Sequence, residues 1–206
     1  MRTHSKETQS SLTPATALQI LKEGNERFVN NLKVNRNLLK QVNETSTGQF
    51  PFATILSCID SRISAELVFD QGLGDVFSIR IAGNVLNEDI LGSMEFSTKI
   101  AGTKVLVVLG HTNCGAIIGA CNHVEMGNLT TLLNKIKPAI LSEKETTENR
   151  NGSNATFVKN VAELNVHLTI ERIRNESSII TELEQQGLIK IVGGLYDVET
   201  GKVEFY

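Results

Sequence analysis

Residues 52–62 read FATILSCIDSR, in which a short apolar run leads directly into a cysteine, an aspartate and an arginine. The run shows no alternation with polar residues, which is typical of a strand buried on both faces. Similar apolar runs occupy residues 76–81, 105–109 and 189–192, and helical patterns lie between the runs at about residues 64–70, 87–101, 115–137 and 156–186. Strands that alternate with helices predict an α/β fold with a mainly parallel central sheet flanked by helices.

The two ends of the chain add a helical arm and a hairpin to this sheet. A threonine followed by a proline suits the start of a helix, which we expect over about residues 14–31. The polar connector at residues 32–49 is expected to let this arm pack on a partner subunit. Residues 196–205 alternate around a Thr-Gly turn, which predicts a C-terminal hairpin at the sheet edge. We find no repeat and expect a single domain over residues 1–206.

The composition excludes several classes of partner. The chain has 20 Lys and Arg against 23 Asp and Glu, with 8 Phe, 2 Tyr and no Trp. It therefore lacks both the basic surplus and the stacking aromatics of a nucleic-acid-binding surface. No window approaches the roughly 18 apolar residues of a membrane span, and the first residues lack the apolar run of a secretory signal. We expect a cytoplasmic protein that binds neither nucleic acid nor membrane.

Metal-binding side chains follow two of the predicted strands. Cys58 comes directly after the first strand, and His111 and Cys114 follow the third. Because ligands bind at the carboxyl ends of parallel strands, these three side chains are expected to meet there. Two thiolates and one imidazole suit zinc, and three protein ligands leave the fourth tetrahedral position to water or substrate. The sequence thus predicts a catalytic zinc site rather than a closed structural one.

Other interpretations of these residues remain open at this point. The three residues could instead pack in the core, or a cysteine and the histidine could form a nucleophilic pair. Cys121 lies in an apolar helical stretch and is interpreted as a packing residue. Asp60 and Arg62 could form an ion pair that only fixes the loop, or Asp60 could bind the metal or accept a proton from water. The outcome depends on whether Arg62 holds Asp60.

The motifs CxDSR at residues 58–62 and HxxC at residues 111–114 each follow a predicted buried strand. In this arrangement the chain resembles the beta-class carbonic anhydrases. The resemblance extends over about residues 49–120 and includes the stretch RIAGN at residues 80–84. It implies a parallel-sheet fold that assembles as a homodimer or as a dimer of dimers.

The resemblance also implies a reaction and the residues that perform it. The reaction is the reversible hydration of carbon dioxide to bicarbonate and a proton, on one zinc ion per chain. Cys58, His111 and Cys114 match the zinc ligands, while Asp60 and Arg62 match the catalytic pair. Zinc lowers the pKa of bound water from about 15.7 toward 7, and the hydroxide attacks carbon dioxide. Asp60 is expected to orient the hydroxide, and Arg62 to orient Asp60.

The substrate pocket of the family is apolar and receives one amide side chain from across the dimer interface. Gln49 matches that amide, Phe77 fits an aromatic wall, and Gly115, which follows the last ligand, is also expected at the substrate. Phe96 stands where plant-like members carry a tyrosine, so the hydrogen bond of that hydroxyl is absent. Both phenylalanines could equally serve core packing.

The resemblance bears on the resting state of the metal as well. Some members have a regulatory bicarbonate site built from Trp, Arg and Tyr, and in these the motif aspartate can move onto zinc. Arg80 is present here, but Ile55 stands at the Trp position and the chain has no Trp. We therefore expect an open site, with Asp60 held by Arg62 and water or a small anion as the fourth ligand.

Two further functions fit the same motifs. Enzymes that hydrolyse carbonyl sulfide or carbon disulfide resemble this chain in both zinc site and fold, and the residues at the metal do not separate them. The other alternative is a zinc-binding regulatory homologue without activity. The intact Asp60 and Arg62 argue against that alternative.

Overall fold

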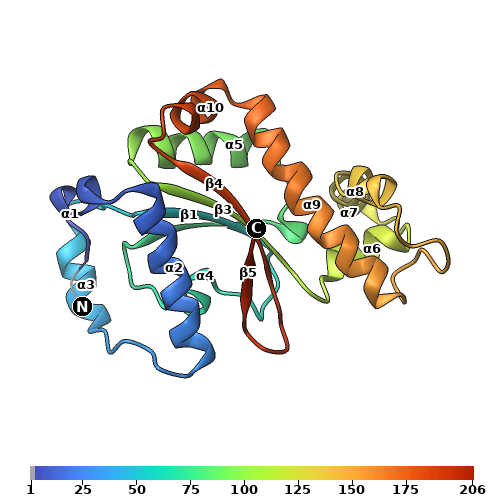
Figure 1. The fold of residues 1–206 in the computed structure, drawn as a ribbon, viewed down its shortest axis with the longest axis horizontal. Helices are drawn as coiled ribbons and strands as arrows, with labels where there is room; N and C mark the ends of the chain where they lie inside the picture. Colours follow the sequence, from blue (N-terminus) through green and yellow to red (C-terminus); the bar gives the residue numbers. More distant parts are fainter. Residues whose placement is uncertain (1–2) are drawn as a thin grey trace.

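The computed structural model describes residues 3–206, which form an α/β fold around a five-stranded sheet (Figure 1). The strands are β1 (Ala53–Ser57), β2 (Val76–Arg80), β3 (Val105–His111), β4 (Lys190–Tyr196) and β5 (Val203–Phe205). They lie in the order β2-β1-β3-β4-β5. The first four strands are parallel, and β5 pairs antiparallel with β4 at one edge. The predicted parallel sheet and C-terminal edge hairpin are confirmed.

Helices pack on both faces of this sheet (Figure 1). They are α1 (Lys6–Ser11), α2 (Pro14–Val29), α3 (Leu38–Thr45), α4 (Ala65–Val68), α5 (Glu88–Glu95), α6 (Gly115–Cys121), α7 (Gly127–Asn134), α8 (Lys137–Ser142), α9 (Ala155–Glu176) and α10 (Ser178–Gln185). A 3₁₀ turn spans Ala82–Asn84, and a π-helical turn at Phe96–Ile100 continues α5. Within residues 3–206, no helix combines the length and apolar character needed to cross a bilayer.

Two helices predicted as continuous are divided in the structure. The predicted helix at 115–137 is broken at His123, whose φ of 53° lies in the left-handed region and ends α6. The predicted helix at 156–186 is broken at Ser177, which has an extended backbone and caps α10 by accepting from the N–H of Ile180. The sequence also does not predict α1 and α3, since both are short and mostly polar.

Each face of the sheet has its own apolar core, because successive residues of a strand point to opposite sides. On β3, Val105, Val107 and Leu109 face the core that includes α2, α4 and α6. Leu106 and Val108 face the core that includes α5 and α10. This double burial explains the continuous apolar runs in the sequence, and it fixes the carboxyl ends of the inner strands between two packed layers.

The apolar side of α2 packs in the core of its own chain, and contact of the arm with a partner subunit stays a prediction. Ala17 and Leu21 of α2 are fully buried in the core that also contains Phe69. Gly24 approaches the end of α4 so closely that an added Cβ would lie 1.8 Å from the carbonyl oxygen of Phe69. The apolar stripe of the arm therefore finds its partner within the same chain.

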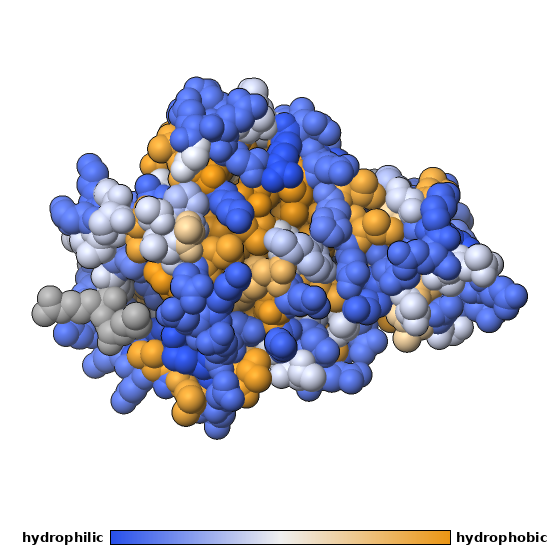
Figure 2. Space-filling view, viewed as in Figure 1, coloured by the Kyte–Doolittle hydropathy of each residue, from blue (hydrophilic) through white to orange (hydrophobic). Residues whose placement is uncertain are grey.

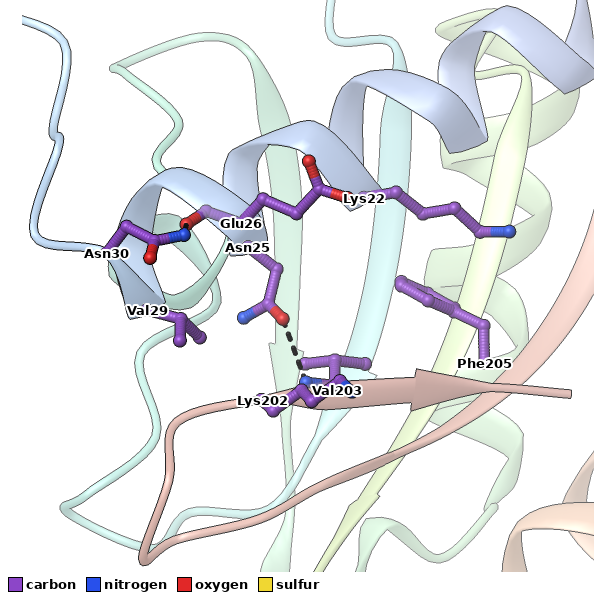
Figure 3. Close-up of a pocket in the computed structure, with 8 residues that line it drawn as sticks. All are labelled: Lys22, Asn25, Glu26, Val29, Asn30, Lys202, Val203 and Phe205. Carbon is purple, nitrogen blue, oxygen red and sulfur yellow. Dashed lines mark hydrogen bonds between the residues drawn. The ribbon is translucent and has the colours of Figure 1, made fainter.

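Asn25 of α2 joins the arm to the C-terminal hairpin. Its side-chain amide donates to the carbonyls of Val68 (3.1 Å) and Gly201 (2.9 Å), and its oxygen accepts from the N–H of Val203 (2.8 Å). Figure 3 shows Asn25 pointing from α2 toward Val203 in the pocket between α2 and β5. The buried amide of Asn25 thus accepts a hydrogen bond from an N–H of the edge strand β5 that would otherwise lack a partner. It also connects α2 to α4 and to the C-terminal hairpin.

A buried carboxylate anchors the polar connector. Asp70 pairs with Arg27 of α2 at 2.6 Å and with Arg36 of the connector, and it accepts from the N–H of Val34 at 3.2 Å. The sequence does not predict this contact, because Asp70 lies more than 30 residues after Val34 and Arg36. Residues 32–49 therefore read as an unattached linker when only the sequence is considered.

Gly24→Ala is expected to destabilise the fold by about 3 kcal/mol, because the added Cβ would overlap the backbone of Phe69 and force α2 away from α4. Gly119→Ala in α6 is the matched control, since the nearest atom to its added Cβ is a methyl of Leu133 at 3.4 Å. In urea unfolding, only Gly24→Ala should lower the midpoint. Equal midpoints for the two variants would show that α2 does not pack against α4 in solution.

Candidate metal centre

The three predicted ligands meet at the carboxyl edge of the sheet. Cys58 directly follows β1, His111 is the last residue of β3, and Cys114 is the N-cap of α6. β1 and β3 are neighbours in the sheet, so their ends emerge side by side. The ligand atoms of all three buried side chains lie within 4.8 Å of one another, and the two Sγ atoms are 4.0 Å apart. The predicted convergence of these residues is confirmed.

The geometry of the cluster fits a zinc ion. Two sulfurs bound tetrahedrally at about 2.3 Å from zinc would be about 3.8 Å apart, close to the separation seen here. The Nε2 atom of His111 is buried and has no hydrogen-bond partner among residues 3–206. A buried nitrogen is costly to leave unpaired, so this atom is suited to hold a metal. Within the described chain no other group of three His, Cys, Asp or Glu side chains converges in this way.

A backbone carbonyl fixes the tautomer of His111. Its Nδ1 lies 2.8 Å from the carbonyl oxygen of Thr112. A carbonyl can only accept, so Nδ1 carries the proton and donates it. The lone pair is then on Nε2, which faces the two cysteines, as a metal-binding histidine requires.

The contact between the two sulfurs shifts the pKa values of Cys58 and Cys114 in opposite directions. The hydrogen bond from the Cys114 thiol lowers the pKa of Cys58 well below its usual value, and the N–H of Gly83 adds a further bond to the Cys58 sulfur at 3.3 Å. The same hydrogen bond, together with burial, raises the pKa of Cys114. These shifts favour ionisation of Cys58 before Cys114, and a divalent cation would favour ionisation of both thiols.

Asp60 is held by Arg62 at the edge of the cluster. The guanidinium donates to both carboxylate oxygens, at 2.9 and 2.8 Å, and the N–H of Arg62 adds a third bond at 3.0 Å. The hydrogen bond from the Arg62 side chain is the largest cause that keeps the pKa of Asp60 well below its usual range. Asp60 Oδ2 lies 4.0 Å from His111 Nε2. The expected Asp60–Arg62 pair is therefore present.

Three polar groups that the sequence did not place at the site support the ligand loop. Arg80 donates to the carbonyls of Cys58 (3.0 Å) and Asp60 (2.8 Å). Gly83, which donates to the Cys58 sulfur, is itself held through its carbonyl by the buried amide of Asn165 (2.9 Å) on α9. Arg80 and Gly83 belong to the RIAGN stretch, whereas nothing in the sequence singles out Asn165, which follows Gly83 by 82 residues.

Gly115 lies beside the cluster, but the other predicted substrate residues lie away from the cluster of their own chain. Gly115 begins α6 directly after Cys114, with open space at its Cα. Phe77 pairs with Thr54 in the sheet, four residues before Cys58, which is about 13 Å along the strand.

Phe77 and Phe96 form an edge-to-face pair with ring centroids 6.3 Å apart, and both line a pocket of about 670 Å³ beside β2 and α5. Gln49 precedes β1 and is exposed, at the opposite end of that strand from the cluster. Roles for these three side chains in the site remain predictions. Cys121 is buried in the apolar core, as expected for a packing residue, and burial raises its pKa to about 11.

Comparison with known proteins gives the family. The family model described as carbonic anhydrase matches residues 53–203. The chain is 34% identical over 197 residues to Carbonic anhydrase 2 of Mycobacterium tuberculosis, covering 92% of this chain and 91% of that protein. It is also 31% identical over 198 residues to the carbonic anhydrase of Mycolicibacterium smegmatis, covering 93% and 92% of the two chains.

Solved structures show the same fold. The beta-carbonic anhydrase CcaA superposes with a TM-score of 0.72 at 23% identity, over 92% of this chain and 94% of that one. With a family model that spans most of the chain and relatives above 30% identity, the chain belongs to the carbonic anhydrase family, and its fold is that of the beta-carbonic anhydrases.

Proposed function

We propose that this protein catalyses the zinc-dependent reversible hydration of carbon dioxide to bicarbonate and a proton. The observation that carries the proposal is the buried cluster of Cys58, His111 and Cys114, with the carboxylate of Asp60 clamped by Arg62 at its edge. Membership in the carbonic anhydrase family supports the reaction.

The three ligands suit a reactive metal site. Two thiolates would balance the charge of Zn²⁺, and the imidazole of His111 completes three ligands with the fourth position free. Bound zinc would supply the Lewis acidity that lets water ionise near neutral pH. The chain's own residues then have to hold that water in place and admit carbon dioxide.

Asp60 is the residue that orients the attacking water in this proposal. An ionised carboxylate only accepts hydrogen bonds, so Asp60 can take one from the water and aim its lone pair at the substrate. Arg62 keeps Asp60 ionised and occupies both of its oxygens, which holds the carboxylate off the metal. The restraint of Asp60 by Arg62 supports an open resting state, in which water or a small anion and not Asp60 takes the fourth position at the metal.

A second copy of the chain would complete the substrate pocket. Gln49, Phe77 and Phe96 lie away from the cluster of their own chain, so we propose that they serve the site of a partner in a homodimer. Self-association is supported by large apolar side chains exposed in the described chain, including Phe96, Leu39 and Leu32, and by the apolar area between α2 and α9 in Figure 2. The solved beta-carbonic anhydrases of Sordaria macrospora, with a TM-score of 0.71 and 23% identity, are tetrameric. A cytoplasmic location stays a prediction.

Zinc dependence is tested by removing one ligand at a time. Cys58→Ser and His111→Ala should lose both bound zinc and carbon dioxide hydration, because the remaining two ligands form an incomplete site. Cys121→Ser is the control, since this buried cysteine lies outside the cluster and should keep one zinc per chain. Zinc is measured by mass spectrometry and hydration by stopped flow. Wild-type protein that stays active after complete metal removal would contradict the proposal. So would zinc-loaded protein that hydrolyses carbonyl sulfide or carbon disulfide but does not hydrate carbon dioxide.

Arg62→Ala is expected to lower carbon dioxide hydration roughly 10- to 100-fold while zinc is retained, because Asp60 loses its clamp and becomes free to approach the metal. Arg174→Ala is the matched control, since Arg174 makes the same two-bond pair with Glu184 at 2.7 and 2.8 Å away from the cluster. Zinc content and stopped-flow rates are measured on both variants. Full activity of Arg62→Ala, or its loss of zinc, would show that Arg62 does not act by restraining Asp60.

Subunit mixing tests whether the pocket is shared. Gln49→Ala supplies intact ligands, and Cys58→Ser supplies an intact Gln49, so each homodimer alone should be impaired. Random exchange of subunits should restore about a quarter of the wild-type activity, because half the dimers then contain one complete site. Activity that stays at the average of the two separate variants would show that Gln49 does not act across an interface.

A further inference from the structure

Thr112 connects the C-terminal hairpin to His111 by hydrogen bonds. Thr112 is the first residue beyond β3, and each of its polar groups makes a hydrogen bond. Its N–H donates to the carbonyl of Tyr196 (2.9 Å), and its hydroxyl accepts from the N–H of Val198 (3.0 Å). Its carbonyl accepts from Nδ1 of His111 (2.8 Å). One residue therefore links the hairpin to the ring that faces the cysteines.

The Thr112 carbonyl is the group that sets the orientation of the imidazole. His111 Nε2 makes no hydrogen bond within residues 3–206, so the ring is oriented by its Nδ1 contact and by packing. Groups that hydrogen-bond to a metal-binding histidine in this way govern both its orientation and its basicity. A shift of this carbonyl would therefore turn Nε2 away from the two sulfurs.

Two contacts to the hairpin hold that carbonyl in place. The bond to Tyr196 extends the β3–β4 ladder by one step beyond the last pair, His111 with Tyr196. The chain then turns sharply, since Asn113 has a φ of 53°. Beyond this point β3 and β4 are no longer paired, and the hydrogen bond between the Thr112 hydroxyl and the N–H of Val198 is the contact that holds Thr112 in place.

The hairpin is itself a firm support. The carboxylate of Asp197 accepts from the N–H groups of Glu199 (2.7 Å) and Thr200 (3.3 Å) and so closes the turn. Asn25 of α2 holds the other side of the hairpin through Gly201 and Val203 (Figure 3). The position of Val198 is therefore fixed by contacts that do not involve the metal site.

We propose that Thr112 is a positioning residue for the metal site, and that its hydroxyl, through Val198, holds the carbonyl that aims His111 at the metal. The proposal rests on the proposed function, in which His111 binds zinc. A hydroxyl that only stabilised the hairpin would leave metal binding unchanged whenever the protein is folded. The two roles therefore predict different behaviour of the bound metal.

Paired substitutions separate these roles. Thr112→Val keeps the shape of the side chain but removes the acceptor for the Val198 N–H, whereas Thr112→Ser keeps the acceptor. Thr200→Val makes the same chemical change in the same hairpin, where the hydroxyl accepts from Lys202 N–H (3.3 Å) and makes no contact with Thr112. Thr112→Ala is a second variant without the hydroxyl, which decides the test if Thr112→Val does not fold.

The measurements are the rate of zinc loss to a chromogenic chelator and the visible absorption spectrum after replacement of zinc by Co²⁺. Thr112→Val and Thr112→Ala should lose zinc roughly tenfold faster than wild type and show altered Co²⁺ bands, because the imidazole is no longer held in one orientation. Thr112→Ser and Thr200→Val should match wild type in both measurements.

The proposal is overturned if Thr112→Val and Thr112→Ala keep the wild-type rate and spectrum, if Thr112→Ser is impaired as much as they are, or if Thr200→Val produces the same change. These outcomes do not depend on carbon dioxide hydration. A wild-type protein that binds zinc but does not hydrate carbon dioxide would refute the proposed function alone. A wild-type protein that binds neither zinc nor Co²⁺ at His111 would refute both.

Discussion

Parallel pairing of β1 with β3 is the constraint on which the candidate site depends. Ser57 lies opposite Leu109, so Cys58 and His111 leave the sheet at the same edge. Both strands are buried on two faces, and a slip of one residue would exchange every side chain between the two cores. The same apolar burial that specifies the sheet therefore also sets the separation of the candidate metal ligands Cys58 and His111.

The sheet brings Cys58 and His111 close together, and polar contacts from distant parts of the chain then fix their exact positions. Arg80 holds the loop that carries Cys58, and Asn165 holds Gly83, which donates to the Cys58 sulfur. Thr112 connects His111 to a hairpin that Asn25 fastens to α2. The candidate ligands are thus held by hydrogen bonds from β2, from α9 and from the C-terminal hairpin. Such contacts would pre-organise a metal site before the ion binds.

The sequence predicts those features that depend on neighbouring residues. The buried strands follow from continuous apolar runs, and the ligand cluster follows from the position of Cys58, His111 and Cys114 after two of them. It does not predict the packing of α2 on its own core, because that rests on Gly24 meeting the Phe69 carbonyl across 45 residues. Nor does it reveal Asn165, since a lone asparagine in a helix has no distinctive pattern. The positions of Gln49 and Phe77 relative to a substrate pocket stay a prediction, because we propose that they belong to the pocket of a second subunit.

The central claim is that this cluster is a zinc site for the hydration of carbon dioxide. The most direct measurement is a titration of metal-free protein with Zn²⁺, in which stopped-flow hydration rates are recorded at each addition. The account predicts that activity rises linearly and reaches a plateau at one zinc per chain. Activity that is absent at one equivalent, or that does not change as zinc is added, would contradict it.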